Sequence, residues 1–445
     1  MKILQEKAEQ VFDIVLKTSE ADETEIHFDW TQNYLTRFAN NEIHQNLGYE
    51  DIEISIRSVF GKKTARTSTH KLDTPSLQRA TRESNRLALL SRVDPFLLPM
   101  PKPQNYSGTR HAFERTAHMN AESRARAVKS PIQIAKSKGL VAAGIFSNRL
   151  SRCALANSSG LRAFYEDTYA VFSTTMMKDS GSSWAKYGHP NASEIPVEML
   201  SLQAAEKAAL SRDPIEISPD QYTVILEPSA VLDLMEFLLL DFGALSVLEK
   251  TSSFTDRIGE KLFGSNIHMD DDVSHPLQSG PPFDGEGIAR QKINLVHNGI
   301  LKNLVYSQST GGRSGKSPTG HGFRLPNTLG EAPTNLVLHG GSSSLEEMIR
   351  TTDQGLLITR FWYIREVDPM QKILTGMTRD GTFLIKDGRI HNAVRNLRFN
   401  ESLFHLLNHV IDLGPSVRAS GEEGMDMVVP ALKAVNFHFT STTKY

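Results

Sequence analysis

Apolar and polar positions in the first half of the chain alternate between the period of a helix and the period of a strand. One face of a predicted helix over residues 3–17 holds Leu4, Val11, Phe12 and Val15. Three β-prone runs follow, at 25–30, 34–46 and 51–68, and the Asn40-Asn41 pair can take the positive φ of a hairpin turn. This pattern predicts an antiparallel meander.

The next elements are predicted by the same signals. Helices are expected over 75–92, over 120–137, where Pro131 disturbs the pattern, and over 196–212. Between the second and third of these helices, two β-prone runs from Cys153 to Met177 meet at residues 158–160, which predicts a hairpin.

The stretch from Tyr222 to Phe254 is interpreted as a buried strand that runs into one long core helix. Residues 222–226 are β-prone, and Pro228 suits the first turn of a helix, which needs no N–H there. Apolar residues then recur at roughly helical spacing, interrupted by acidic residues such as Asp233 and Asp241. Since a membrane span needs about 20 mostly apolar residues, this helix is expected in a protein core.

Strands and turns dominate the rest of the chain. Asn298-Gly299 and Asp387-Gly388 predict hairpins, Ser344 with Glu347 predicts a capping box for a helix that Gly355 ends, and a last helix is expected at about 401–413. The fold class is therefore α+β. We expect an N-terminal α/β domain (1–215) with antiparallel strands and helices, and a C-terminal, mostly antiparallel β domain (216–445) with a central core helix.

Composition narrows the class of protein. The 445 residues are 39% apolar and 22% charged with a net charge of −2, which is ordinary for a globular protein and offers no general attraction to nucleic acid or membrane. The single cysteine, Cys153, excludes an intrachain disulfide and a Cys-rich zinc module. The first residues are too charged for a secretory signal, so a cytoplasmic location is expected.

Two motifs suggest phosphate or zinc binding and are interpreted otherwise. The segment 311–317, GGRSGKS, ends like a phosphate-binding loop but has Thr310 where that loop needs glycine, so a flexible surface loop is predicted, whose Arg313 and Lys316 could contact an acidic ligand. His405 and His409 have the spacing of two zinc ligands on a helix, but no glutamate follows as a general base. They are interpreted as surface histidines.

Three further groups carry candidate chemistry. His268 and His275 flank the acidic run 270–272, which could hold a hard cation but is interpreted as a solvated loop. Cys153 lies in an apolar run and is predicted to be a packed, inert thiol. Asp284 and Glu286 could present two carboxylates, although alternating glycines there favour a turn. The residues alone leave the activity open.

The order of several motifs resembles the TldD/PmbA family, whose members mature and degrade peptides in the prokaryotic cytoplasm. The resemblance is carried by TRFANNEI (36–43), ANSSGL (156–161), SSFTDRIGEKLF (252–263), PFDGEGIARQKINLVHNGILKNLVYS (282–307) and TRDGTFLIKDGRI (378–390). It runs the length of the chain.

The resemblance also separates two kinds of chain within that family. TldD-type chains carry His-Glu-x-x-x-His in the central helix, then Leu-Glu, and a cysteine near the C-terminus completes their zinc site. An alignment anchored on Leu248-Glu249 puts Asp241 at the first histidine, Phe242 at the catalytic glutamate and Ser246 at the second histidine. The C-terminal segment also lacks cysteine. The resemblance therefore implies a PmbA (TldE) type chain with degenerate positions, no catalytic or metal-binding residues of its own and no cofactor.

The role expected from this resemblance is that of a non-catalytic subunit. It would bind unfolded peptide and pair with a TldD-type catalytic subunit as a heteromer, or form a homodimer, without nucleic acid or membrane. Two alternatives stay open: a stand-alone, metal-independent hydrolase that uses Asp241, the Asp284/Glu286 pair or His297, and a homodimeric peptide-binding protein. No substrate-binding residue is assigned.

Overall fold

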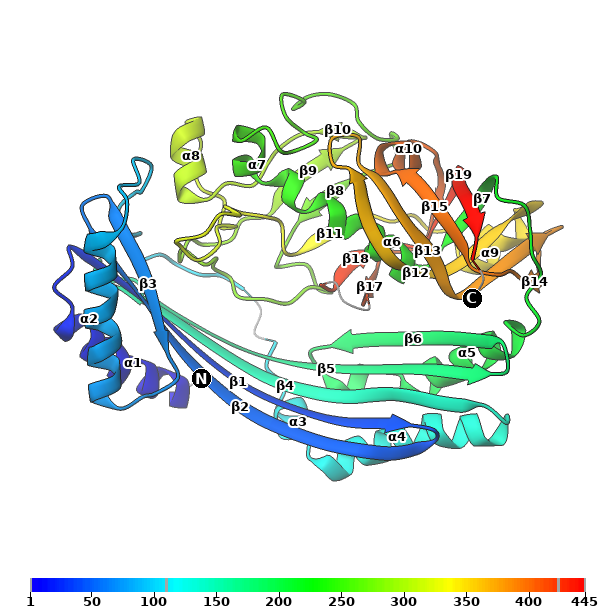
Figure 1. Ribbon diagram of the computed structural model, residues 1–445, viewed down its shortest axis with the longest axis horizontal. Coiled ribbons are helices and arrows are strands. Elements are labelled where there is room, and N and C mark those ends of the chain that lie inside the picture. The colour runs from blue at the N-terminus through cyan, green and yellow to red at the C-terminus, as the bar shows by residue number, and fades with distance from the viewer. Residues whose placement is uncertain (1, 109–110, 422–424, 444–445) are drawn as a thin grey trace.

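The first half of the chain forms one long, curved, antiparallel sheet. The computed structural model describes residues 2–108, 111–421 and 425–443. The sheet has six strands in the order β3-β2-β1-β4-β5-β6, with these bounds: β1 Glu23–Ala39, β2 Glu42–Phe60, β3 Lys63–Thr69, β4 Val141–Asn157, β5 Arg162–Lys178 and β6 Gly181–His189. Figure 1 shows this sheet bending along one side of the second half of the chain.

Turn residues set the hairpins of this sheet. Asn40 (φ 52°) and Asn41 (φ 62°) join β1 to β2, and Gly160 (φ 91°) lies in the turn between β4 and β5. Asparagine and glycine tolerate positive φ better than other residues, so these turns follow from the local sequence. The predicted meander and the predicted hairpin at 158–160 are both confirmed.

Helices cover the two ends of the long sheet, as Figure 1 shows for α1 and α2 at one end and α4 at the other. Asp73 caps α2 by accepting a 2.9 Å hydrogen bond from Ser76 N, and Asn120 caps α4 in the same way from Ser123 N. The predicted helices are confirmed, and Pro131 lies inside a continuous α4. The bounds are α1 Lys2–Thr18, α2 Thr74–Leu90, α3 Glu114–Ala117, α4 Ala121–Ser137, a 3₁₀ turn Ala192–Glu194 and α5 Val197–Leu210.

The second half of the chain contains two sheets. The first has the strand order β10-β9-β8-β11-β18-β17, and the second has the order β12-β7-β19-β15-β13-β14, with β16 paired to β19. Their bounds are β7 Gln221–Leu226, β8 Met269–Asp271, β9 Ile293–His297, β10 Ile300–Leu301, β11 Leu336–Leu338, β12 Gln354–Asp368, β13 Ile373–Lys386, β14 Arg389–Ala393, β15 Leu397–Ser402, β16 Val410–Leu413, β17 Val417–Ala419, β18 Met427–Val429 and β19 Leu432–Thr442.

The larger of these two sheets closes on itself. Because β12 also pairs with β13, the strands β12, β7, β19, β15 and β13 form a ring. Its interior is filled by aromatic side chains, among them Phe361, Phe399 and Phe437, whose ring centroids lie 4.8 to 5.8 Å apart. The predicted α+β class is confirmed, and the Asn298-Gly299 and Asp387-Gly388 hairpins form as β9–β10 and β13–β14.

The expected long core helix is wrong, because the chain breaks it at Gly243. The segment consists of α6 (Pro228–Met235), 3₁₀ turns at Glu236–Leu238 and Leu240–Phe242, an extended Gly243 and α7 (Ala244–Leu248). Gly243 bridges to Val305, and a Cβ on this glycine would lie 2.4 Å from Glu331 O. The α-helix itself ends at Met235, and the close contact with a distant part of the chain stops the 3₁₀ turns that follow it.

Three shorter predictions also need correction. The segment at 311–317 is largely helical, since α8 spans Gln308–Ser314 and Gly315 ends it at φ 63°. Helix α9 spans Leu345–Arg350, so Gly355 lies in β12, and Ser344 caps α9 without a reciprocal bond because the Glu347 carboxylate binds Arg350. The last helix, α10, spans only Leu403–Asn408, and β16 occupies the rest of the predicted range.

The connection between the two halves lies near residues 214–220. The first sheet uses residues 23–189, and the other two use residues 221–442. Ile215 N already donates a 2.9 Å hydrogen bond to Ala393 O in the second half. The domain bounds 1–215 and 216–445 stay a prediction. No helix within the described ranges is long and apolar enough to cross a membrane.

Candidate functional site

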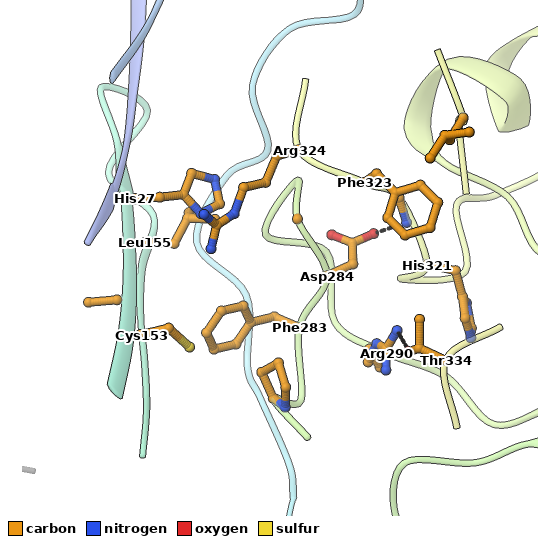
Figure 2. A pocket seen from close by; sticks show the side chains of 15 residues that line it. His27, Cys153, Leu155, Phe283, Asp284, Arg290, His321, Phe323, Arg324 and Thr334 are labelled. Carbon is orange, nitrogen blue, oxygen red and sulfur yellow. Dashed lines mark hydrogen bonds between the residues drawn. The ribbon is translucent and has the colours of Figure 1, made fainter. Parts of the chain in front are cut away.

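A cavity of about 640 Å³ lies where the long sheet faces loops of the second half. His27 of β1 and Cys153 of β4 line it from the sheet, as Figure 2 shows, while Asp284, His321 and Arg324 line it from the opposite side. Volumes of this size are typical of small-molecule or peptide sites. The cavity exists only because two distant parts of the sequence meet.

The Asp284–Glu286 turn forms part of the wall on the second half. Asp284 accepts hydrogen bonds from the backbone N–H groups of Glu286 (2.9 Å), Ile288 (2.9 Å) and Gly322 (2.7 Å), so its carboxylate holds the turn in shape. Glu286 is 1% exposed, and its Oε2 accepts a 2.8 Å bond from Gln308 N. The sequence predicted a turn with two carboxylates, and the structure brings both into the interior.

Burial changes the protonation of this pair. Removal from water raises the pKa of Asp284 to about 6, although three backbone N–H groups oppose the shift. Burial, together with the charge of Asp284, raises the pKa of Glu286 to about 8. At neutral pH the turn therefore carries one carboxylate, on Asp284, and one protonated carboxyl group, on Glu286.

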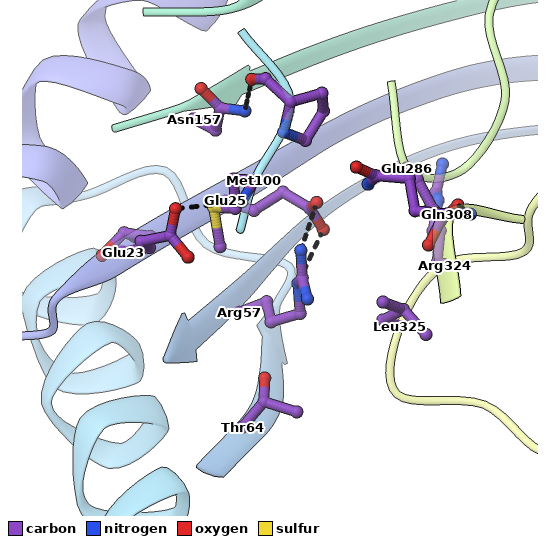
Figure 3. A network of polar contacts seen from close by, with 12 residues as sticks. Glu23, Glu25, Arg57, Thr64, Met100, Asn157, Glu286, Gln308, Arg324 and Leu325 are labelled. Carbon is purple, nitrogen blue, oxygen red and sulfur yellow. Dashed lines mark hydrogen bonds and ion pairs between the residues drawn. The ribbon is translucent and has the colours of Figure 1, made fainter. Parts of the chain in front are cut away.

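Charged side chains of the sheet lie opposite this turn (Figure 3). Glu25 accepts from Arg57 Nη2 (2.9 Å) and from Arg66 Nη2 (2.5 Å), and burial alone would raise its pKa, but the two guanidinium groups and His27 hold that pKa well below its usual value. Burial lowers the pKa of His27 to about 4, so the imidazole is neutral. These residues carry no recognisable motif, and sequence reasoning missed them.

One ion pair joins the two halves directly beside the cavity. Arg324 donates to both oxygens of Asp29 on β1, at 2.7 and 2.8 Å. This bidentate geometry fixes the position of the 321–324 loop against the sheet. No spacing rule relates the two residues in the sequence, because folding alone brings them together.

Cys153 behaves as the sequence predicted. Burial raises the pKa of its thiol, and the negative charges of Asp29 and Asp167 add to that shift. A thiol that keeps its proton is a poor nucleophile and a poor metal ligand. Although it lines the cavity, its environment is that of a packed, inert side chain.

The positions that resemble the zinc motif hold other interactions. Asp241 Oδ1 accepts from Ser253 N and Oγ, both at 2.7 Å, and its Oδ2 lies 2.5 Å from Lys372 Nζ. Phe242 is fully buried against Phe254, with ring centroids 4.8 Å apart. Ser246 lies in α7, and its carbonyl accepts from Thr251 N. Phe242 has no donor atom and both carboxylate oxygens of Asp241 are already paired, so these positions do not present a set of zinc ligands with an open position.

The histidine candidates do not assemble into a metal site. His405 Nδ1 lies 2.9 Å from Glu401 Oε1, and His409 Nδ1 lies 2.8 Å from the His405 carbonyl. His268 and His297 are exposed neighbours, with 3.3 Å between their Nδ1 atoms. Across residues 2–108, 111–421 and 425–443, no group of three or more His, Cys, Asp or Glu side chains could hold a metal ion.

The acidic run 270–272 corrects another interpretation, because it is buried rather than solvated. Asp270, Asp271 and Asp272 are 5%, 1% and 6% exposed, and the first two belong to strand β8. Each has a partner: Asp270 binds His339 (2.9 Å), Asp271 binds His321 (2.9 Å) and Asp272 binds Ser274. The three consecutive residues are all acidic and all buried, so the sequence shows no alternation of apolar and polar positions that would indicate this strand. His275 does not join a ligand set with this run.

The sequence of the second half identifies the family. The sequence profile of the PmbA/TldA metallopeptidase C-terminal domain matches residues 219–441, which is half of the chain. The chain therefore belongs to the PmbA/TldD family, and the resemblance found in its motifs is confirmed.

The chain is also similar to several individual proteins. An uncharacterized protein of Methanocaldococcus jannaschii is 33% identical over 215 residues, which is 47% of this chain and 51% of that protein. The metalloprotease PmbA of Escherichia coli O157:H7 is 22% identical over 339 residues, covering 73% of this chain and 71% of that protein. The chain spans only about half the length of the first curated relatives that it matches, with shares of 51%, 42% and 61%. The crystal structure of TldE from Thermococcus kodakarensis has the same fold, with a TM-score of 0.88 at 20% identity over 98% of this chain and 100% of that chain.

Proposed function

We propose that this chain is a non-catalytic, PmbA/TldE-like subunit that pairs with a TldD-type zinc metallopeptidase and binds unfolded peptide. The observation that carries the proposal is the set of contacts made by Asp241 and Phe242, which stand at two positions of the zinc motif in the alignment. One is committed to Lys372 and Ser253, and the other fills an aromatic core. Hydrolysis by a zinc peptidase needs metal ligands and a carboxylate that accepts a proton from water; Phe242 can serve as neither, and the Asp241 carboxylate is already paired with Lys372 and Ser253.

The arrangement of the two halves suits a peptide-binding role. The walls of the cavity between the long sheet and the 281–285 and 321–324 loops combine aromatic side chains, such as Phe283 and Phe323, with charged ones such as Arg290. Extended peptides are commonly held by main-chain hydrogen bonds to strand edges, with side-chain pockets for selectivity. The long sheet ends in two such edges, β3 and β6.

Zinc content tests the absence of a metal site in this chain. The untagged protein is purified from zinc-replete cells without chelator, and metals are measured by mass spectrometry. We expect well under one zinc per chain, because Asp241 is paired with Lys372 and Ser253 and Phe242 has no donor atom. One tightly held zinc per chain would refute the non-catalytic assignment.

The pairing is tested by reconstitution. This chain is mixed with a TldD-type chain whose His-Glu-x-x-x-His motif is intact, and cleavage of an unfolded peptide is measured for each chain alone and for the mixture. We expect turnover only when the TldD-type chain is present, and faster turnover in the mixture. Equal cleavage by the TldD-type chain alone would remove the role as a partner.

The same experiment separates the alternatives. Hydrolysis by this chain alone that Asp284→Asn abolishes, but an exposed control Glu346→Gln does not, would assign the activity to a metal-independent hydrolase. Saturable peptide binding by a homodimer without turnover, and without any effect on a TldD-type chain, would assign a homodimeric binding protein.

A further inference from the structure

The cavity between the long sheet and the 281–285 and 321–324 loops, of about 640 Å³, is lined mostly by apolar surface. Four of its apolar lining residues have accessible surface to offer a ligand: Leu329, which is 54% exposed, and the half-buried Phe323, Pro281 and Cys153. A protonated thiol such as that of Cys153 behaves as a small apolar group. Figure 2 shows Cys153 on the sheet and Phe323 on the loops, so apolar groups stand on both walls.

The charged side chains that line this cavity already have partners. Arg324 donates to both oxygens of Asp29, and Asp284 accepts from three backbone N–H groups. Each nitrogen of the Arg290 guanidinium donates to a neutral acceptor, namely Gly320 O (3.2 Å), Asn335 Oδ1 (2.5 Å) and Thr334 Oγ1. Asp284 carries the opposite charge nearby, since burial raises its pKa and the charge of Arg290 opposes that shift. No single sign of charge dominates these walls.

The two histidines of the lining do not change this balance. Burial lowers the pKa of His27 to about 4, so its imidazole is neutral at pH 7. The Nε2 atom of the buried His321 lies 2.9 Å from Asp271 Oδ1, so this side chain is paired as well. A charged group that entered the cavity would leave water without meeting a free counter-ion, which costs free energy. The walls therefore disfavour charged ligand groups of either sign.

A large apolar side chain fits these walls better than any other peptide group. It has no hydrogen bonds with water to lose, and its transfer from water to apolar surface is favourable. The volume of about 640 Å³ lies in the range of ligand sites and leaves room for the main chain beside such a side chain.

We infer that this cavity holds one large apolar side chain of an unfolded peptide, such as phenylalanine or leucine, and excludes charged side chains. The inference rests on the proposed function and names the part of the peptide that the cavity recognises. Large apolar side chains are mostly buried in folded proteins and become exposed in unfolded chains. A cavity that selects them therefore selects unfolded segments.

A set of blocked peptides tests this selectivity on the full chain. Their sequence is acetyl-Gly-Ser-Gly-X-Gly-Ser-Gly-amide, where X is phenylalanine, glutamine, lysine or glutamate, and binding is measured by isothermal titration calorimetry at pH 7. We expect the phenylalanine peptide to bind at least about tenfold more tightly than the glutamine peptide, because only its side chain gains from burial. The lysine and glutamate peptides should bind no more tightly than the glutamine peptide. Equal affinity for all four peptides, tighter binding of either charged peptide, or no binding at all would overturn the inference.

Variants at an exposed lining residue assign the binding to this cavity. Leu329→Asp replaces apolar surface by a carboxylate, so we expect about a tenfold loss of affinity for the phenylalanine peptide and a gain for the lysine peptide. The matched control is Leu210→Asp at the end of α5, where the leucine is 53% exposed and lies outside this cavity; it should change neither affinity. Thermal melts verify that the variants are folded. If Leu329→Asp does not fold, Leu329→Ala replaces it, and an unchanged affinity for the phenylalanine peptide would overturn the inference.

These measurements and the reconstitution with a TldD-type chain can fail separately. Equal affinity for all four peptides, together with faster turnover in the mixture, would refute the apolar selectivity and leave the subunit role in place. Selective binding of the phenylalanine peptide without any effect on a TldD-type chain would support the selectivity and refute the pairing.

Discussion

At the scale of single residues, Glu286 shows how burial in the interior of this molecule changes the protonation of a side chain. Its carboxyl group is buried beside a second carboxyl group, so the folded protein favours its protonated form. An unfolded glutamate releases its proton near pH 4.5. Between these two values the folded state holds a proton that the unfolded state has lost.

The contribution of Glu286 to the stability of the protein should therefore fall as pH rises through this window. The contribution of Glu286 is fully present below about pH 4.5 and is lost as pH rises toward about 8, by at most about 1.4 kcal/mol per pH unit. We expect Glu286→Gln, which cannot lose a proton and can still accept from Gln308 N, to flatten this decline. Urea unfolding at pH 5 and pH 8.5 measures it, and Glu346→Gln, at an exposed position, serves as the control. Parallel pH profiles for Glu286→Gln and the wild type would contradict the assignment.

Phe242 should contribute to the free energy of unfolding as a core residue does. Its side chain is fully buried against Phe254, whereas Leu240, two residues earlier, is 46% exposed. We expect Phe242→Ala to lower the free energy of unfolding by about 3–5 kcal/mol, through lost apolar contact and a residual cavity. Leu240→Ala should cost under about 1 kcal/mol. Chemical denaturation compares the two, and similar losses would mean that Phe242 is not a core residue.

At the scale of elements, the sequence predicted those turns whose conformation depends only on the residues within them. The Asn40-Asn41, Asn298-Gly299 and Asp387-Gly388 turns were predictable because each pair adopts positive φ by its own chemistry. The break at Gly243 was not predictable from the sequence. That residue has ordinary extended angles (φ −75°, ψ 130°), and the residue that it approaches closely, Glu331, lies far along the chain. The site residues His27, Arg57 and Arg324 were missed for the same reason, because only folding makes them neighbours.

The break in the central helix should depend on the missing side chain of Gly243. We expect Gly243→Ala to destabilise the protein by about 1–3 kcal/mol, because the new methyl group would press on Glu331 O. Gly312→Ala in α8 is the matched control, since its Cβ would meet only the flexible Leu98 side chain at 3.2 Å. That change should be neutral or slightly stabilising. Thermal unfolding of both variants measures the difference, and equal effects would show that the Glu331 contact relaxes freely.

At the scale of the whole molecule, the two halves are held together partly by the Asp29–Arg324 pair. The side chains are 28% and 39% exposed, so solvent weakens their attraction despite the bidentate geometry. We expect a double-mutant cycle of Asp29→Asn and Arg324→Gln to give a coupling energy of about 0.5–1 kcal/mol, smaller at high salt. A coupling energy near zero would leave apolar packing and other polar contacts, such as Lys207–Glu227 (2.6 Å) and Ser182–Asp380 (2.7 Å), to join the halves.

The closed ring of strands has a consequence for synthesis on the ribosome. The long sheet is complete once residue 189 has emerged, and its strands pair mostly with sequence neighbours. In the ring, β7 (Gln221–Leu226) must wait for β19 (Leu432–Thr442), so more than two hundred residues of chain are translated before the ring can close. Until then Phe361 and Phe399 inside the ring lack their partner Phe437, which β19 itself carries. We therefore expect the first sheet to form before the ring closes, and chaperones that bind apolar segments to engage the second half preferentially.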